Sequence, residues 1–264
     1  VDLLVQPFRF LDEKNNPKLA FMTFSFPKIK SRFINLAANT DPEYSLVHTL
    51  MVYNDEKTET ERFVDTPTGL ENMSTFTVPH LGNQREYAVV SEVFGEFVQS
   101  NREEVTKQVI GVGKQTVLAS PPLSTSSEHL ELSDLLIGIK YPQESGASRN
   151  RFPVIPSNKI WETDSLKIYL EVYHLFLDSK GMAHFNIDFE VSKLQGKKKN
   201  KEESISLSFN FDSPFRTSKE TFEIDISKLF PGNYEFLVKV TDTVSRESKE
   251  RTAAFEVQGE GQIK

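Results

Sequence analysis

Alternation of apolar and polar residues is the dominant pattern along the chain, and its period of two is that of a half-buried β-strand. The segment 183–191, AHFNIDFEV, places Phe, Ile, Phe and Val on one face and Asn, Asp and Glu on the other. Segments 204–211, 221–226 and 233–240 repeat the pattern, whereas helical spacing is scarce. The chain is therefore predicted to be all-β, with antiparallel strands of the kind found in sandwiches.

One segment is apolar or aromatic on both faces. In 165–176, SLKIYLEVYHLF, one face carries Leu and Ile at alternate positions, and the other carries Tyr169 and Tyr173 beside Lys167 and Glu171. This pattern predicts a central strand whose second face is also covered, by a neighbouring domain or by a loop.

The first half of the chain follows the same pattern less regularly. Its candidate strands are 19–26, 44–53, 61–66 and 74–78. The phrase HLGNQREYAVVSEVF that follows them, at 80–94, is similar to KLFPGNYEFLVKVTD at 228–242. A comparable series of strands precedes each phrase. We therefore predict that one sandwich plan occurs twice.

Aligning the two phrases places Tyr87 opposite Tyr234. For both we predict a tyrosine-corner-like anchor, in which the ring packs at the edge of the core and the hydroxyl bonds back to the preceding loop. The alternative is that each is an ordinary core aromatic.

A boundary is expected where Pro121 and Pro122 interrupt the strand pattern, because proline cannot donate a ladder hydrogen bond. A chain of 264 residues also exceeds the ~100–150 residues of a typical domain. We predict two tandem immunoglobulin- or fibronectin-like antiparallel β-sandwiches, 1–122 and 123–264, that touch one another. The segment 141–161 has three prolines and no clear period, and it is predicted to be a long loop.

Charge and composition exclude several classes of function. The net charge of −7 argues against a nucleic-acid surface, which needs a basic face. The absence of cysteine excludes disulfides, thiolate zinc sites and a cysteine nucleophile. No apolar run approaches the ~18 residues of a membrane helix, so the chain is not expected to span a membrane. Because it starts at Val1 inside strand-like sequence, we expect a piece of a longer protein.

Motifs for catalysis are scarce. The five histidines lack metal-ligand spacing, although His174 and His184 could approach one another across a hairpin. No GxSxG, phosphate-binding loop or DxDxDG calcium loop occurs. We therefore predict no catalytic residue, metal or cofactor.

Acidic pairs are the remaining catalytic alternative. Asp212 with Glu220, or Glu162 with Asp164, could flank a glycosidic bond, although a chain with 38 acidic residues contains such pairs by chance.

A binding surface is suggested by the single tryptophan, Trp161, at the end of the proline-rich segment. With Tyr141, Tyr169 and Tyr173 it could form a stacking surface for a sugar or a peptide. The alternative is that Trp161 seals the sandwich edge beneath its own loop.

The strings LELSDLLIGI, FPVIPSNKIW and LKIYLEVYHL, followed by IDISKLFPGNYEFLVKVTD, resemble the region that accompanies the GWxTD domain in bacterial, Bacteroidetes-like proteins. The resemblance covers about 128–258. The GWxTD string itself is absent, so the activity of that domain does not transfer. The resemblance implies a sandwich module without assigned activity in a periplasmic, cell-surface or secreted protein.

The sequence thus favours a non-catalytic tandem module with a structural or protein-interaction role. Its expected partners are other domains of the parent protein or an envelope protein, and no nucleic acid. Any binding surface is expected on 141–161 and in the interdomain cleft. The alternatives are a carbohydrate-binding accessory module, an enzyme with an acidic pair in that cleft, and assembly through an exposed strand edge.

Overall fold

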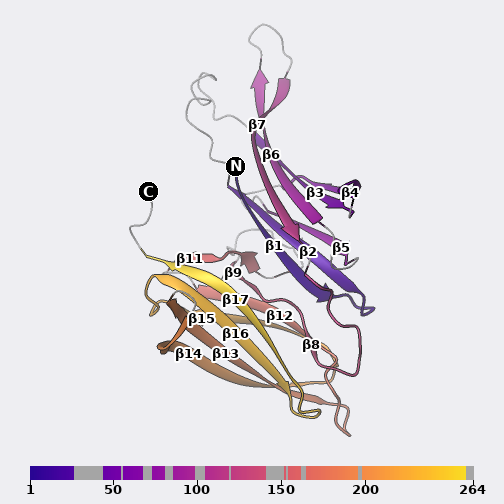
Figure 1. Ribbon diagram of the computed structural model, residues 1–264, viewed down its shortest axis with the longest axis vertical. Coiled ribbons are helices and arrows are strands. Elements are labelled where there is room, and N and C mark those ends of the chain that lie inside the picture. Colours follow the sequence, from indigo (N-terminus) through magenta and orange to yellow (C-terminus); the bar gives the residue numbers. More distant parts are fainter. Residues whose placement is uncertain are drawn as a thin grey trace. The chain divides into compact units, whose positions relative to one another are not determined.

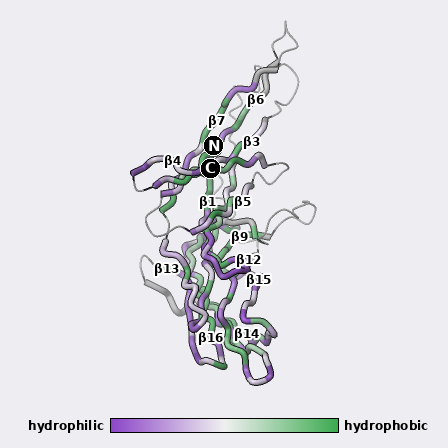
Figure 2. Tube along the Cα trace, turned by 90° about the vertical axis from the view of Figure 1, so that its right-hand side faces the viewer, coloured by the Kyte–Doolittle hydropathy of each residue, from purple (hydrophilic) through white to green (hydrophobic). Residues whose placement is uncertain are grey.

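The computed structural model confirms the all-β prediction: its regular elements are β-strands in largely antiparallel sheets, with no helix among the described residues (Figure 1). Those residues are 1–26, 44–54, 56–67, 73–80, 86–98, 105–118, 120–140, 152, 154–161, 165–195 and 198–259. None of them forms a helix with the length and apolarity that crossing a membrane requires. Hydrophilic and hydrophobic residues alternate along the strands (Figure 2).

The chain divides into two compact units. The first unit comprises Val1–Pro7 and Leu19–Pro122, and the second comprises Phe8–Lys18 and Leu123–Lys264. The division after Pro122 falls where the strand pattern is interrupted. The segment 8–18 lies within the predicted first domain, 1–122, but is part of the second unit. The prediction of two immunoglobulin- or fibronectin-like domains stays a prediction.

The first unit is built from two sheets. One has the strand order β1-β2-β5 and the other β4-β3-β6-β7. The bounds are β1 Asp2–Leu11, β2 Pro17–Phe26, β3 Tyr44–Tyr53, β4 Glu59–Asp65, β5 Met73–Pro79, β6 Glu86–Val98 and β7 Val105–Leu118. β1 and β2 also contribute their 8–11 and 17–18 ends to the second unit.

The second unit is also built from two sheets. One has the order β10-β9-β12-β15 with β8 beside β12, and the other has the order β11-β17-β16-β13-β14. In the first of these the bounds are β8 Glu131–Leu132, β9 Leu136–Lys140, β10 Val154–Pro156, β12 Ser165–Tyr173 and β15 Ser218–Asp225. In the other they are β11 Lys159–Trp161, β13 Ala183–Gln195, β14 Lys198–Ser213, β16 Gly232–Asp242 and β17 Ser248–Gln258.

The two units share one strand order. β1-β2-β5 corresponds to β9-β12-β15, and β4-β3-β6-β7 corresponds to β14-β13-β16-β17. The phrases that are similar in sequence overlap β6 and β16. β6 lies between β3 and β7, and β16 lies between β13 and β17. The internal repeat in the sequence therefore has a counterpart in topology.

Each unit has its own apolar core between its sheets. In the first unit the core includes Phe21, Leu50 and Tyr87, all 0% exposed. In the second unit β12 and β16 supply much of the core, including Ile168 and Phe236. Full burial of such a side chain contributes about 1.5–3 kcal/mol, so these inward rows dominate the stability of each sandwich.

One strand pair departs from the antiparallel prediction. β11 pairs with β17 in parallel, with Trp161 opposite Gln258. The reason is that the chain leaves β10 in one sheet and enters the edge of the other sheet as β11. The segment 141–161, predicted to be a loop throughout, therefore contains two short strands.

Candidate functional site

The predicted stacking surface of Trp161, Tyr141, Tyr169 and Tyr173 is not assembled as expected. Trp161 is half-buried on β11, and Tyr141 lies outside the described residues. Tyr169 and Tyr173 are buried, with 4% and 3% exposure. Stacking on a ligand needs rings at the surface. The two tyrosines cannot serve this purpose because the second face of β12 is covered, as its two-sided apolar pattern predicted.

Tyr169 and Tyr173 instead hold a buried carboxylate, Glu171, which is 1% exposed. The Tyr169 hydroxyl donates to Glu171 Oε1 at 2.6 Å, and the Tyr173 hydroxyl donates to Oε2 at 2.8 Å. The Tyr173 oxygen also accepts the backbone N–H of Leu11 at 3.0 Å. Burial, together with the Glu171 charge, raises the pKa of Tyr173. The protonated phenol is therefore the form that satisfies this site.

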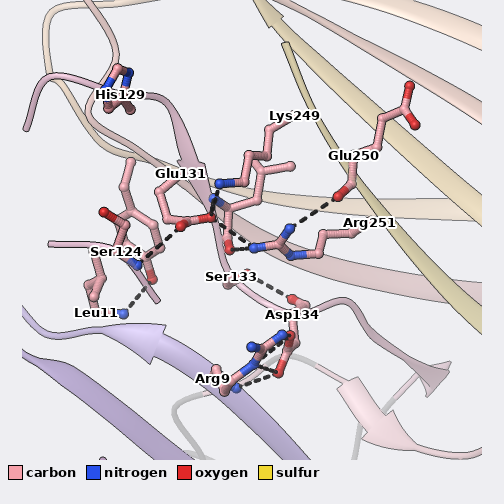
Figure 3. Close-up of polar contacts among 12 residues, drawn as sticks. Arg9, Leu11, Ser124, His129, Glu131, Ser133, Asp134, Lys249, Glu250 and Arg251 are labelled. Atoms are coloured by element: carbon pink, nitrogen blue, oxygen red, sulfur yellow. Dashed lines mark hydrogen bonds and ion pairs between the residues drawn. The ribbon is translucent and has the colours of Figure 1, made fainter. Parts of the chain in front are cut away.

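A second buried carboxylate, Glu131 on β8, lies in the polar network of Figure 3. Its Oε1 is 3.1 Å from Lys249 Nζ and 2.8 Å from Arg251 Nη2, both on β17. Burial acts to raise the pKa of Glu131, but hydrogen bonds from the backbone of Leu132 and Ser124 and from Lys249 hold it below its usual value. Glu131 is therefore ionised and hydrogen-bonded within the second unit.

The tip of the β1–β2 hairpin, which is part of the second unit, is held there by an ion pair between Arg9 and Asp134 (Figure 3). Arg9 Nε donates to both Asp134 oxygens at 3.0 and 2.9 Å, and the Arg9 backbone N–H donates to Asp134 Oδ2 at 2.9 Å. The Asp134 backbone N–H donates to Arg9 O at 3.0 Å. This reciprocal pairing of backbone and side chain explains why 8–18 belongs to the second unit.

A polar layer crosses the core of the first unit. His48 on β3 is 0% exposed, and its Nε2 and Nδ1 lie 2.7 Å from Ser25 Oγ and Ser74 Oγ. Ser25 Oγ donates to Ser91 Oγ, also at 2.7 Å. The single Ser25 hydrogen is thereby used, so His48 Nε2–H donates to Ser25 and Nδ1 accepts from Ser74. The chain of hydrogen bonds joins both sheets.

This arrangement contains a Ser–His contact but has no access for a substrate. Ser25, Ser91 and His48 are fully buried and Ser74 is 2% exposed. Burial lowers the pKa of His48 to about 4, although the Asp65 charge opposes the shift. The neutral imidazole therefore acts as a structural hydrogen-bonding group between the sheets.

The first testable prediction concerns this histidine. In an NMR titration of histidine-labelled protein, we expect one imidazole to titrate near pH 4, and His48→Gln should remove its resonance. His129 and His184, whose pKa values are raised by hydrogen bonds to carboxylates, should titrate above 6.5. Since the unfolded chain takes up the proton first, stability should fall by about 1.4 kcal/mol per pH unit as pH decreases from 6.5 toward 4. Titration of every histidine above pH 6 would contradict this assignment.

Of the predicted acidic pairs, Asp212 and Glu220 have different hydrogen-bond partners. Asp212 on β14 lies 2.5 Å from His184 Nδ1, whereas Glu220 on β15, in the other sheet, accepts from Ser218. Glu162 and Asp164 lie outside the described residues. His174 contacts Asn15 and the His129 carbonyl, so it does not share the partners of His184. In the part of the chain that the structure describes, no three His, Asp or Glu side chains could hold a metal ion.

The two anchor tyrosines are both in the cores. Tyr234 is 1% exposed, and its hydroxyl donates to the Phe230 carbonyl four residues earlier at 2.7 Å. This is the backward bond expected of a tyrosine corner. Tyr87 is 0% exposed and packs on Phe21, with the ring centroids 4.8 Å apart.

The outer edge of β14 is the candidate interaction site. β14 ends its sheet and pairs with β13 alone among the described strands. From Ser204 to Ser213 it pairs with β13 without a register shift. Leu207 and Phe209, on its apolar face, are 39% and 40% exposed. A long edge strand presents a row of backbone donors and acceptors to any incoming strand.

The apolar row beside this edge is held in place from behind. The Phe209 ring lies 5.9 Å from Phe189 and 5.6 Å from Phe222, and Phe211 stacks on Phe185 at 5.2 Å. These contacts fix one side of each ring, while Phe209 keeps solvent on its other side. The sequence pattern predicted this row correctly but gave no indication that its strand ends a sheet.

The usual protections of an edge strand are absent between 204 and 213. Natural edges carry proline, lysine or a bulge that blocks further pairing. The stretch SISLSFNFDS contains neither proline nor lysine, and Asp212 is its only charge. The register shift in the β13–β14 pairing, between Ser192 and Lys193, lies just before this stretch begins. Among the described strands none pairs with the outer edge of this stretch, which suits it to strand addition.

Comparison with known proteins shows no matching family, and no curated protein matches the chain. Among solved structures, the chain is similar to Bacteroides uniformis beta-glucuronidase 2 covalently bound to cyclophellitol-6-carboxylate aziridine, with 10% identity and a TM-score of 0.29. That likeness covers 89% of this chain and 26% of the other, so the chain spans about a quarter of that protein.

Proposed function

We propose that this chain is a non-catalytic, protein-interaction module that binds an extended segment by strand addition at the outer edge of β14. The observation that carries the proposal is the exposure of Leu207 and Phe209 along an unprotected edge strand. Backbone hydrogen bonds would supply affinity, and the alternate apolar side chains would supply specificity.

The burial of other chemically active groups supports this choice. Glu131, Glu171 and His48 are each engaged by partners inside the fold, so their hydrogen-bonding capacity stabilises the sandwiches. The resemblance to the region beside the GWxTD domain suggests in addition that the module belongs to an extracytoplasmic bacterial protein, where its partner would be another envelope protein or another domain.

The probe for strand addition is a fluorescein-labelled peptide with the alternating sequence SISLSFNFDS, taken from 204–213. We expect its fluorescence anisotropy to rise with protein concentration. The protein variant Leu207→Lys/Phe209→Lys should weaken binding by about tenfold or more, because lysine at an edge opposes pairing.

Two controls separate strand addition from nonspecific adhesion. Val64→Lys changes an exposed valine on β4, the strand that corresponds to β14 in the first unit, and should leave binding unchanged. A peptide of the same composition with its apolar residues grouped together should not bind. Equal binding of both peptides, or equal loss in both lysine variants, would refute the proposal.

A further inference from the structure

We propose that the segment accepted by β14 is β14 of a second copy of this chain, in an antiparallel pairing centred on Ser208. This inference rests on the proposed function, since it names the partner of the same edge. It is carried by the order of residues along 204–213, which is complementary to itself in one register.

Backbone geometry limits the possible registers. On β14 every second residue directs its N–H and C=O away from β13, and in an antiparallel ladder two such residues must face each other. The two-fold axis that relates the two copies must therefore lie level with one residue of β14, so that this residue faces its own equivalent in the second copy. The axis cannot lie between two consecutive residues. The candidate centres near the middle of the regular stretch are Leu207, Ser208 and Phe209.

Centring on Ser208 matches every pair. Leu207 then faces Phe209, and Ile205 faces Phe211, so the apolar rows of the two copies become continuous. On the other face the pairs are Ser206 with Asn210, Ser204 with Asp212, and Ser208 with itself. Each of these polar pairs joins a hydroxyl donor to an oxygen acceptor.

The neighbouring centres give mismatches. Centring on Leu207 pairs Leu207 with itself and Ile205 with Phe209, but leaves Phe211 beyond the start of the partner's 204–213 stretch. Centring on Phe209 places Ile205 opposite Ser213 and Ser204 opposite Pro214, which cannot donate a hydrogen bond. Apolar cross-strand pairs stabilise a ladder, and the Ser208 register forms the most of them. The Ser208 register is thus favoured by the sequence of the strand.

The second copy also satisfies the symmetry of most homo-oligomers. A two-fold interface uses the same patch on both partners, and an antiparallel pairing of one strand with itself has this property. The exposed sides of Leu207 and Phe209 would be covered by the equivalent residues of the partner copy. The sheets of the two copies would form one continuous sheet across the interface.

The experiment is site-specific crosslinking in the full chain, which has no cysteine of its own. In the variant Ser208→Cys the two thiols face each other, and cross-strand Cα atoms of such a pair lie about 4.5–5.5 Å apart. In the matched control Ser206→Cys the two thiols are four residues apart along the ladder, or about 13 Å. Both serines are exposed on the same face of β14.

Under mild oxidation we expect Ser208→Cys to give a disulfide-linked dimer and Ser206→Cys to remain monomeric on non-reducing electrophoresis. Light scattering of the unmodified protein should give about twice the chain mass of 30.1 kDa, and Leu207→Lys/Phe209→Lys should restore the monomer. Equal crosslinking of both cysteine variants would overturn the register, since random collisions do not distinguish the two positions.

The outcomes also separate this inference from the proposed function. A monomeric protein that still binds the SISLSFNFDS peptide would overturn the second copy as partner and leave strand addition at β14 standing. A monomeric protein that does not bind the peptide would overturn both proposals.

Discussion

Replacing Phe8 with alanine is expected to lower the free energy of unfolding of the second unit by about 3–5 kcal/mol, as large-to-small changes in packed cores do. Phe8 is 0% exposed, and its ring meets Phe152 edge-on at 4.9 Å and lies 6.0 Å from Tyr169. The truncation removes these contacts and leaves a cavity over the second face of β12.

The measurement is urea unfolding followed by the fluorescence of Trp161, which is the only tryptophan and lies on β11 of the second unit. Phe215→Ala is the matched control, because Phe215 belongs to the same unit but is 69% exposed. It should shift the midpoint little. The same midpoint in Phe8→Ala and in the unmodified protein would contradict the assignment of 8–18 to the second unit.

Replacing Glu131 with alanine should lower the stability of the same unit by about 3 kcal/mol, because it leaves two cations without their partner. The side chain of Glu131 is 5% exposed, and those of Arg251 and Lys249 are 20% and 36% exposed. Glu131→Gln should cost less, since its single amide oxygen can replace Oε1, which accepts from the Leu132 N–H and from Arg251, although the bond from the Ser124 N–H to Oε2 is lost.

The sign of the pH effect follows from the lowered pKa of Glu131. Its contribution is fully present above the pKa of the unfolded chain, about 4.5, and is lost as pH falls through the folded value. Urea unfolding at pH 7 and at pH 3, again followed by Trp161, should show the difference between Glu131→Ala and the unmodified protein shrinking in acid.

The control for Glu131 is Glu256→Ala. Glu256 lies 3.9 Å from Lys159 in an exposed pair, whose removal should cost at most about 1 kcal/mol. If Glu131→Ala were no more destabilising than Glu256→Ala, the buried network of Figure 3 would not contribute to stability as we infer.

Strand positions were the most predictable feature, because alternation has a physical cause that is local to each strand. The segment 44–53 was predicted and observed as β3 with the same bounds, and 183–191 lies within β13. The two-sided apolar pattern of 165–176 correctly predicted a covered central strand. Even the polar layer left a signal, since His48 occupies an inward position between Leu46 and Leu50.

The candidate site was less predictable. The stacking surface near Trp161 was predicted from the aromatic residue types alone. Tyr169 and Tyr173 are instead buried beneath the tip of the β1–β2 hairpin, which no local pattern reveals. The apolar row of β14 was predicted from its alternation, but its position at the end of a sheet was not. It is half-exposed at Leu207 and Phe209 because no described strand continues the sheet beyond it.

The sequence by itself determined the class of fold, the strands and their inward faces, because a period of two and the placement of prolines act within a few residues. Only the tertiary structure decided which strand ends a sheet, which charges are buried, and that 8–18 packs into the second unit. These depend on how separate strands assemble, in some cases through residues distant in the sequence. Arg9 and Asp134 are 125 positions apart, and neither residue specifies the other in the sequence.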